Sequence, residues 1–168
     1  MKESDFKIAE KLYIESFPED ERRSLSSVYS LLDSPIFEFI PIKEDNNFLG
    51  FANIWDFPDF VYIEHFAIMP NMRNNGIGSR FLKTLQERKN KPIVLEVEKP
   101  DNDLAKRRIG FYQRMGFHLL EDYYLQPPYT KESQSVEMKI MVFSPKEENE
   151  ICFKKIKDTL YKFVYKAK

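Results

Sequence analysis

The sequence has little cysteine and little glycine. Its 168 residues contain one cysteine, Cys152, and five glycines. A single cysteine excludes a disulfide within the chain and a thiolate metal site, so Cys152 is interpreted as a small apolar residue. No apolar run approaches the roughly 20 residues of a membrane-spanning helix, so we expect no membrane partner. The charged start, MKESDFKIAEK, does not resemble a secretory signal, which makes the cytoplasm the expected location.

The chain also lacks a large net charge. It has 26 basic and 27 acidic residues, which gives a formal net charge of −1. Bulk attraction to nucleic acid is therefore not expected, and any phosphate-bearing ligand must be held by a local arrangement of groups. Apolar residues make up 42 % of the chain, which suffices for the core of one domain at this length.

Apolar residues recur at helical or strand spacing along most of the chain. Their order, helices and a hairpin followed by alternating strands and helices, predicts a mixed α/β sheet in one domain, residues 1–144. A helical extension, residues 145–168, follows. The predicted helices cover 5–16, 24–33, 76–89, 101–115 and 145–165, and the predicted strands cover 36–42, 48–55, 60–68, 93–98, 117–125 and 136–143.

The extension carries its own start signal. Ser144, Pro145 and Glu147 fit a Ser-x-x-Glu capping box with proline in the first turn. The apolar stripe of this predicted helix must be buried, either against the same domain or against a partner subunit, so a homodimer is one possible assembly. The stripe consists of Ile151, Ile156, Leu160, Phe163 and Val164.

Two of the five glycines, Gly76 and Gly78, lie in one short loop, RNNGIG, between a predicted strand and a predicted helix. The first turn of a helix has unpaired N–H groups and a partial positive charge. Glycine lets a ligand approach the backbone closely, and Arg73 adds a full charge. The loop therefore predicts a phosphate or pyrophosphate site, with an ordinary strand-to-helix turn as the alternative.

Two common nucleotide motifs are excluded. The chain has no GxxxxGK run followed by Ser or Thr, and the third glycine of a dinucleotide fingerprint would fall on Phe81. The pattern Arg-x-x-Gly-x-Gly instead resembles the acyl-coenzyme A loop of the GNAT acyltransferase superfamily. A second segment, IGFYQRMGF at 109–117, resembles the later helix of that superfamily, which ends in Tyr-x-x-x-Gly-Phe. The motifs lie in the expected order with one strand between them.

The resemblance covers roughly residues 37–143. It implies a GNAT-like α/β (α+β) fold: a mixed, mostly antiparallel sheet with a splayed central parallel strand pair, flanked by helices, plus the C-terminal helix. It also implies acetyl-coenzyme A as the acyl donor and no metal. Backbone amides of 74–79 would surround the pyrophosphate, and the strand before the loop would pair with the pantetheine arm. The implied donor-site residues are Phe66, Ala67, Ile68, Arg73, Asn74, Asn75, Gly76, Ile77, Gly78, Ser79 and Tyr112.

Acetyl transfer to an amine poses two proton problems. The amine, with a pKa of about 10, must lose a proton, and the thiolate leaving group, with a thiol pKa of about 8.5, must gain one. A base near the acceptor and an acid near the sulfur are therefore expected. Tyr112, the tyrosine of the matched Tyr-x-x-x-Gly-Phe motif, is the candidate acid, and a core tyrosine is the alternative. The lack of a convincing Cys/His or Ser/His pair is consistent with direct attack in a ternary complex.

Glu64 is the candidate base. It precedes the loop on a predicted strand, at a place where many members of the superfamily carry an acid, and alternation puts it on one face with Phe66 and Ile68. A solvated or salt-bridged glutamate is the alternative for Glu64. Glu96, which shares one side of the next strand with Glu98, could serve as the base instead. His65 and His118 are interpreted as structural residues.

The acceptor is expected to be a small-molecule primary amine, and the nearby carboxylates favour a cationic one. In the superfamily this side of the site is built from the early helices and their connection, which here is FPEDERR at 17–23. A charged solvent loop is the alternative for this segment. The rival function is an acyl-coenzyme A sensor, or an interaction protein of the same fold, without transferase activity. The candidate acceptor-binding residues are Phe17, Glu21, Arg22, Glu64, Glu96 and Glu98.

Overall fold

The computed structural model describes residues 3–167, and its centre is a seven-stranded sheet in the order β1-β2-β3-β4-β7-β5, with β6 also paired to β7. All neighbouring strands are antiparallel except β3 and β4, which run parallel. The predicted mixed sheet with one central parallel pair is therefore confirmed. The strands are β1 (Phe37–Glu44), β2 (Asn47–Asp56), β3 (Val61–Ile68), β4 (Ile93–Glu98), β5 (His118–Leu119), β6 (Tyr124–Gln126) and β7 (Val136–Phe143).

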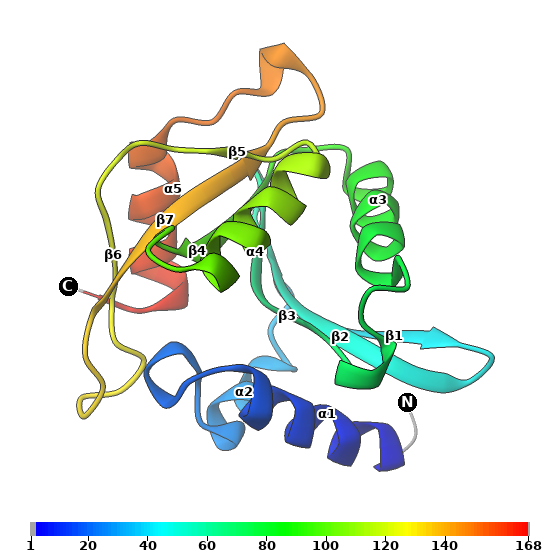
Figure 1. Ribbon diagram of the computed structural model, residues 1–168. Coiled ribbons are helices and arrows are strands. Elements are labelled where there is room, and N and C mark those ends of the chain that lie inside the picture. The colour runs from blue at the N-terminus through cyan, green and yellow to red at the C-terminus, as the bar shows by residue number, and fades with distance from the viewer. Residues whose placement is uncertain (1–2, 168) are drawn as a thin grey trace.

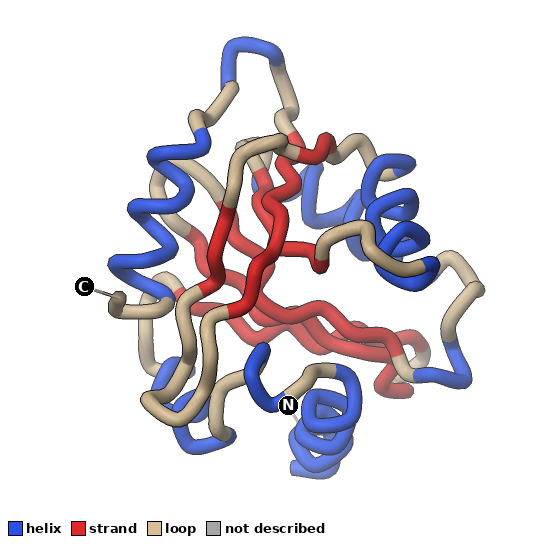
Figure 2. Tube along the Cα trace, turned by 60° about the vertical axis from the view of Figure 1, so that its left-hand side comes forward, coloured by secondary structure: helices blue, strands red, loops and turns tan. Residues whose placement is uncertain are grey.

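Helices cover both faces of the sheet (Figures 1 and 2). One face packs against α3 and α4, and the other packs against α1 and α2 at one end and α5 at the other. None of the helices within residues 3–167 is long and apolar enough to cross a membrane. The α-helices are α1 (Glu3–Ser16), α2 (Leu25–Leu31), α3 (Ile77–Lys89), α4 (Asp103–Arg114) and α5 (Phe153–Thr159). The 3-10 turns are η1 (Glu19–Glu21), η2 (Pro70–Met72) and η3 (Glu147–Asn149). Helix α5 continues into a π turn, η4 (Leu160–Val164).

Alternation along β2 explains how both faces become apolar. Ala52 and Ile54 lie in the core under α3 and α4, whereas Phe51 and Trp55 lie in the cores on the opposite face. Successive side chains of a strand point to opposite faces, so a strand that is apolar throughout can be buried on both. The central strands thus form a rigid layer between the helices.

A β-bulge in β3 changes the predicted orientation of Glu64. Asn53 pairs with His65 and Ile54 pairs with Ile63, so Glu64 is the extra residue of the bulge. The extra residue breaks the alternation of side chains by one position. Phe66 packs into the core under α3 and α4, while Glu64 contacts Trp55 on the opposite face. The prediction that Glu64 and Phe66 share a face was therefore wrong.

The predicted strand at 117–125 also needs correction. The predicted strand at 117–125 is two short strands, β5 and β6, because the chain leaves the β7 edge between them. The Lys139 Nζ atom stabilises the segment between β5 and β6 by donating to the backbone carbonyls of Glu121, at 2.9 Å, and Asp122, at 3.4 Å.

The tail helix begins later than predicted. Cys152, not Ser144, is the N-cap of α5, and the Ser144 hydroxyl is buried without a hydrogen-bond partner among the described residues. Lys146, Glu147 and Glu148 are exposed, and the chain runs from β7 through the turn η3 to α5 (Figure 1). A short helix needs a packed apolar face, and the first apolar residues of the tail that pack on the core are Ile151, Phe153 and Ile156.

The apolar stripe of the tail is buried against its own domain. Ile156, Leu160 and Val164 lie in the core with Trp55 and Tyr62. Phe163, the fourth stripe position in that helix, is 44 % exposed. The stripe therefore does not require a second subunit to cover it, and a homodimer stays a prediction.

Candidate functional site

The central parallel pair of strands separates after three residue pairs. Val61, Tyr62 and Ile63 of β3 pair with Ile93, Val94 and Leu95 of β4, and the pairing ends there. The next residues on the two strands are Glu64 and Glu96. Beyond them lies a cleft of about 730 Å³, lined by both strands, by residues 16–18 and Glu21, and by the start of α3 and one side of α4. This is the splayed pair that the family resemblance implied.

The RNNGIG loop forms one wall of this cleft. Gly76 has φ 72°, in the left-handed region, and is the N-cap of α3 without a side-chain cap. Asn74, with φ 63°, is also left-handed, and the Arg73 Nε atom donates to the Ile68 carbonyl at 3.0 Å. These contacts fold the loop back onto the end of β3. The uncapped first turn of α3 consequently has backbone N–H groups available on the cleft side.

Gly78 has a different role from Gly76. A Cβ atom at Gly78 would lie 3.4 Å from Phe111 Cζ and 3.5 Å from Phe66 Cζ, which are ordinary contact distances. The packing of the protein therefore does not require glycine at this position. Gly78 lines the cleft, so the missing side chain widens the approach to the helix start.

Nearly all predicted donor-site residues line the cleft; Asn75 is the exception. Its side-chain amide donates to the Met72 carbonyl at 3.3 Å. Among the predicted acceptor-binding residues, Arg22 does not line the cleft, and its Nε atom donates to the Phe17 carbonyl at 3.1 Å. The structure thus brings together the glycine loop, Tyr112 and the predicted glutamates around one space.

Tyr112 lies on α4 and lines the cleft. Its ring packs edge-on against Phe117 and Phe111. The hydroxyl has no hydrogen-bond partner within residues 3–167. Burial raises the pKa of Tyr112 to about 12, although the Arg108 guanidinium opposes part of this increase. The phenol therefore stays protonated at neutral pH, as a proton donor must.

Two hydrogen-bond donors bind the Glu64 carboxylate. Its Oε1 atom accepts from Arg23 Nε at 2.8 Å, its Oε2 atom accepts from Trp55 Nε1 at 2.8 Å, and its side chain is 0 % exposed. Burial raises the pKa of Glu64, but the Arg23 charge and the hydrogen bonds outweigh burial and hold it below the ordinary value. A carboxylate that is paired and ionised in this way has little tendency to accept a proton.

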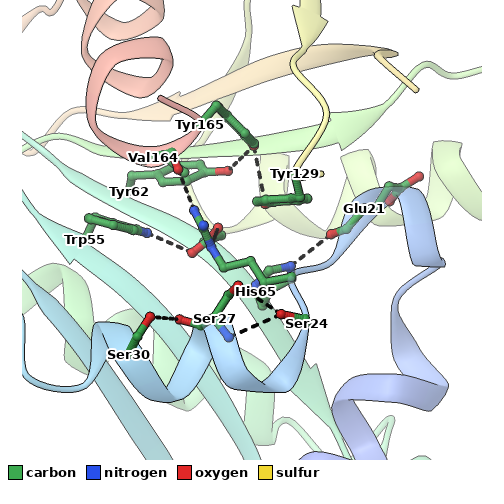
Figure 3. Close-up of polar contacts among 12 residues, drawn as sticks. Glu21, Ser24, Ser27, Ser30, Trp55, Tyr62, His65, Tyr129, Val164 and Tyr165 are labelled. Atoms are coloured by element: carbon green, nitrogen blue, oxygen red, sulfur yellow. Dashed lines mark hydrogen bonds and ion pairs between the residues drawn. The ribbon is translucent and has the colours of Figure 1, made fainter. Parts of the chain in front are cut away.

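Arg23 was not singled out from the sequence, although it belongs to the predicted acceptor segment. Its guanidinium donates to the Val164 carbonyl at 2.6 Å and lies over the rings of Tyr129, at 4.8 Å, and Trp55, at 5.7 Å. Figure 3 shows Trp55, Tyr129 and Val164, the residues that these contacts involve, on different sides of the same space. The available signal was a glutamate in an otherwise apolar strand, since a buried carboxylate needs a cationic partner.

Glu96 is hydrogen-bonded but has no ion-pair partner within residues 3–167. Its Oε1 atom accepts from Tyr124 at 2.5 Å, its Oε2 atom accepts from Gln126 Nε2 at 2.6 Å, and Tyr165 donates to the same carboxylate at 2.8–2.9 Å. Burial raises the pKa of Glu96 to about 7, against the lowering effect of these three hydrogen bonds. The carboxylate can therefore take up and release a proton near neutral pH.

More acidic groups line the acceptor side. Burial and the nearby Glu98 carboxylate raise the pKa of Glu21, while Glu98 itself contacts Arg108 at 3.3 Å. His65 Nε2 forms a 3.0 Å hydrogen bond with the Glu21 carbonyl, and Phe17 packs against the imidazole with ring centroids 4.6 Å apart. Burial lowers the pKa of His65, so the imidazole is neutral and holds the 17–21 segment in place.

The family of the chain follows from comparison with known proteins. The model of the Acetyltransferase (GNAT) family matches residues 6–117. The chain belongs to this family. A solved structure described as "Putative acetyltransferase from GNAT family from Bacteroides thetaiotaomicron" is 41 % identical, covers 98 % of this chain and 94 % of its own, and superposes with a TM-score of 0.90.

Two further proteins are similar to this chain. "Putative acetyltransferase YjbC" of Bacillus subtilis (strain 168) is 29 % identical over 138 residues, which are 81 % of this chain and 70 % of YjbC. A GNAT acetyltransferase from Elizabethkingia anophelis, solved with acetyl-CoA bound, is 15 % identical, covers 72 % of this chain and 83 % of its own, and has a TM-score of 0.52. The latter similarity concerns the fold alone.

Proposed function

We propose that this protein transfers an acetyl group from acetyl-coenzyme A to a primary amine, by direct attack within a ternary complex. One observation carries the proposal. The cleft between β3 and β4 has the uncapped start of α3, the protonated Tyr112 phenol and the Glu96 carboxylate in its walls. These are an anion site, an acid and a base, which are the three groups that the reaction requires.

Acetyl-coenzyme A, the acyl donor, would occupy the α3 side of the cleft. Its pyrophosphate would accept hydrogen bonds from the backbone N–H groups that follow Gly76, with Arg73 nearby. Its pantetheine arm would lie along Phe66–Ile68, where β3 has left its β4 partner. The thioester would then reach the point at which the two strands separate.

The structure supports Glu96 rather than Glu64 as the base. Glu64 is ionised and tied to Arg23, whereas the pKa of Glu96 lies at about 7, close to the working range of a general base. A carboxylate has about four lone-pair sites, and three donors reach Glu96, so it retains room for an amine or a bridging water.

The reaction balances with these residues. The neutral amine nitrogen attacks the thioester carbonyl carbon, the new C–N bond forms, and the C–S bond breaks. Glu96 takes the proton that the nitrogen loses, directly or through water, and Tyr112 gives its phenolic proton to the departing sulfur. The products are an acetamide and the free thiol of coenzyme A. Proton return from Glu96 to Tyr112 through solvent restores the enzyme.

The acceptor is proposed to be a small cationic amine. Of the acidic groups on the acceptor side, Glu64 is neutralised by Arg23 and Glu98 contacts Arg108. Glu21 and Glu96 have no such partner within the described part of the chain. Uncompensated carboxylates at a partly buried site favour a ligand that brings positive charge.

The test is an amine panel with acetyl-coenzyme A as donor. Simple monoamines, diamines, amino acids and a peptide with a free N-terminus are compared by release of the coenzyme A thiol, and the product is identified by mass spectrometry. We expect release that depends on the amine, fastest with small cationic acceptors. Donor binding without amine-dependent release by any acceptor would contradict the proposal and favour the sensor.

A further inference from the structure

The C-terminal segment lies behind the wall of the cleft, where the Tyr165 hydroxyl contacts the cleft-lining Glu96. We infer that Tyr165 is a positioning residue for the Glu96 carboxylate, and that the tail from Leu160 to Tyr165 supports the acceptor wall of the cleft from behind. The inference deepens the proposed function, since it rests on Glu96 acting as the base.

The Tyr165 hydroxyl is the centre of a buried hydrogen-bond network. It lies 2.8 Å and 2.9 Å from the two Glu96 oxygens, 3.1 Å from the Gln126 Nε2 atom and 3.1 Å from the Tyr62 hydroxyl. The Tyr129 hydroxyl donates to it at 3.5 Å. Figure 3 shows Tyr62 and Tyr129 joined to Tyr165.

The direction of these hydrogen bonds is fixed by chemistry. The Gln126 amide nitrogen can only donate, so Tyr165 accepts from it and has its single hydroxyl proton free for another partner. An ionised carboxylate can only accept, so this proton goes to Glu96. Tyr165 therefore stabilises the ionised form of Glu96, and it orients the carboxylate at the same time.

The fold places Tyr165 by means of an unusual turn. The Tyr165 N–H donates to the Leu160 carbonyl at 3.0 Å, which is the i→i−5 bond of the π turn η4. Leu160 and Val164 are buried in the sheet core and anchor this turn, and the Ala167 N–H donates to the Tyr161 carbonyl at 2.8 Å beyond it. A wider turn in a helix is often found at functional sites.

The same tail also contacts the partner of Glu64, a second glutamate of the cleft. The Val164 carbonyl accepts from the Arg23 guanidinium at 2.6 Å, and Arg23 binds Glu64. Two adjacent tail residues thus contact two glutamates of the cleft: Tyr165 binds Glu96 directly, and Val164 reaches Glu64 through Arg23. A tail that only filled the core would need the apolar stripe but not these polar contacts.

The experiment must separate tuning of Glu96 from ordinary packing. The groups that surround the Glu96 carboxylate and affect its ionisation come from several elements, so only a change confined to one hydroxyl is informative. They are Tyr62 and Glu64 of β3, Tyr124 and Gln126 of β6, Tyr129 of the following loop, Tyr161 of η4, and Tyr165.

The primary variant is Tyr165→Phe, which keeps the ring and removes the hydroxyl. The readout is the titration of the Glu96 carboxyl carbon by NMR of protein labelled with ¹³C-glutamate, assigned by its loss in Glu96→Gln. Losing one donor to a carboxylate should raise the titration midpoint by about one pH unit. The acid limb of kcat/KM should move upward by the same amount, while acetyl-coenzyme A binding stays unchanged.

Tyr161→Phe is the matched control. Tyr161 belongs to the same tail, but its hydroxyl donates to the Leu125 carbonyl and not to Glu96. We expect this variant to lose some stability without moving the Glu96 midpoint. Should Tyr165→Phe fail to fold, 3-fluorotyrosine at position 165 keeps the hydroxyl and makes it a stronger donor, so the Glu96 midpoint should fall.

The outcomes are distinct. A Glu96 midpoint that does not move in Tyr165→Phe, or does not fall with 3-fluorotyrosine, overturns the inference and leaves Tyr165 a packing residue. A midpoint that moves as predicted supports the positioning role, because the titration needs no substrate. If the midpoint moves but the wild-type protein acetylates no amine, the positioning role of Tyr165 holds and the proposed function fails.

Discussion

Arg23 and Glu64 form a buried ion pair, with Arg23 Nε 2.8 Å from Glu64 Oε1 and side chains that are 12 % and 0 % exposed. The pair joins the segment after η1 to the bulge of β3. It therefore fixes the acceptor wall of the cleft relative to the strand along which the donor would lie. In the proposed mechanism the pair keeps Glu64 ionised, and Glu96 is the base.

Removing one partner of this pair should cost much more than removing both. Arg23→Met leaves the Glu64 carboxylate buried without its counter-ion, at a cost of about 3–5 kcal/mol in the free energy of unfolding. Arg23→Met combined with Glu64→Gln should recover most of the loss. Urea unfolding of the wild type, both single variants and the double variant measures this coupling. Additive effects would show that the pair is not the connection described.

The pH dependence of the ion pair has a definite sign. Arg23 and the hydrogen bonds hold the pKa of Glu64 below its ordinary value of 4.5. The stability from the pair is therefore present above pH 4.5 and is lost as the pH falls through the lowered pKa. The difference in Tm between wild type and the double variant, measured from pH 7 down to pH 3, follows this loss.

Tyr112→Phe should separate chemistry from binding. The variant keeps the ring that packs on Phe111 and Phe117 but loses the proton that the sulfur would receive. We expect kcat to fall about a hundredfold or more, with the acetyl-coenzyme A dissociation constant nearly unchanged. Steady-state rates with the best amine, together with calorimetric titration of the donor, test this. An unchanged kcat would remove Tyr112 from the mechanism.

Glu96→Gln should lower activity and raise relative stability. The pKa of Glu96 is raised from 4.5 to about 7, so the folded protein binds this proton more tightly than the unfolded chain does. The free energy of unfolding of the wild type should therefore fall as the pH rises from 4.5 to 7, and the neutral glutamine avoids this loss. We expect the Tm of the variant, relative to wild type, to increase between pH 5 and pH 8.

The same variant should lose the low-pH limb of kcat/KM that reports the base. The exposed Glu87 offers a control, because Glu87→Gln should change neither the Tm difference nor the pH profile. If Glu64→Gln abolished the acid limb while Glu96→Gln kept it, the base would be Glu64.

The two glycines of the loop should respond differently to alanine. Gly76→Ala forces a side chain into the left-handed region, at φ 72°, and should cost about 1–2 kcal/mol of stability. Gly78→Ala meets only ordinary contacts and should leave Tm nearly unchanged. Its methyl group would narrow the approach to the helix start, so donor affinity should fall about tenfold, or about 1.4 kcal/mol. Full donor affinity in Gly78→Ala would place the pyrophosphate elsewhere.

The sequence predicted the features that local chemistry determines. A glycine loop before an amphipathic helix, and a largely apolar strand on each side of them, have local signatures, and the structure shows these elements as α3, β3 and β4. The mostly antiparallel sheet and its central parallel pair followed from the family resemblance, and both are present.

The remaining features depend on contacts between distant parts of the chain. Arg23 and Glu64 are 41 residues apart, and Glu96 and Tyr165 are 69 residues apart. No spacing rule links such pairs. The bulge at Glu64 changed which face its side chain occupies, and packing against the sheet overrode the capping box at Ser144. These misses concern the acceptor end of the cleft, where tertiary contacts build the site.

The most direct test of the account is the thermal midpoint of the protein with acetyl-coenzyme A, with ATP and NAD as controls. A ligand at a hundred times its dissociation constant stabilises the folded state by about 2.7 kcal/mol. For a chain of 168 residues this corresponds to a rise of roughly 5 to 10 °C. The account predicts this rise with acetyl-coenzyme A alone. No rise, or an equal rise with ATP or NAD, would contradict a coenzyme A site between β3 and β4.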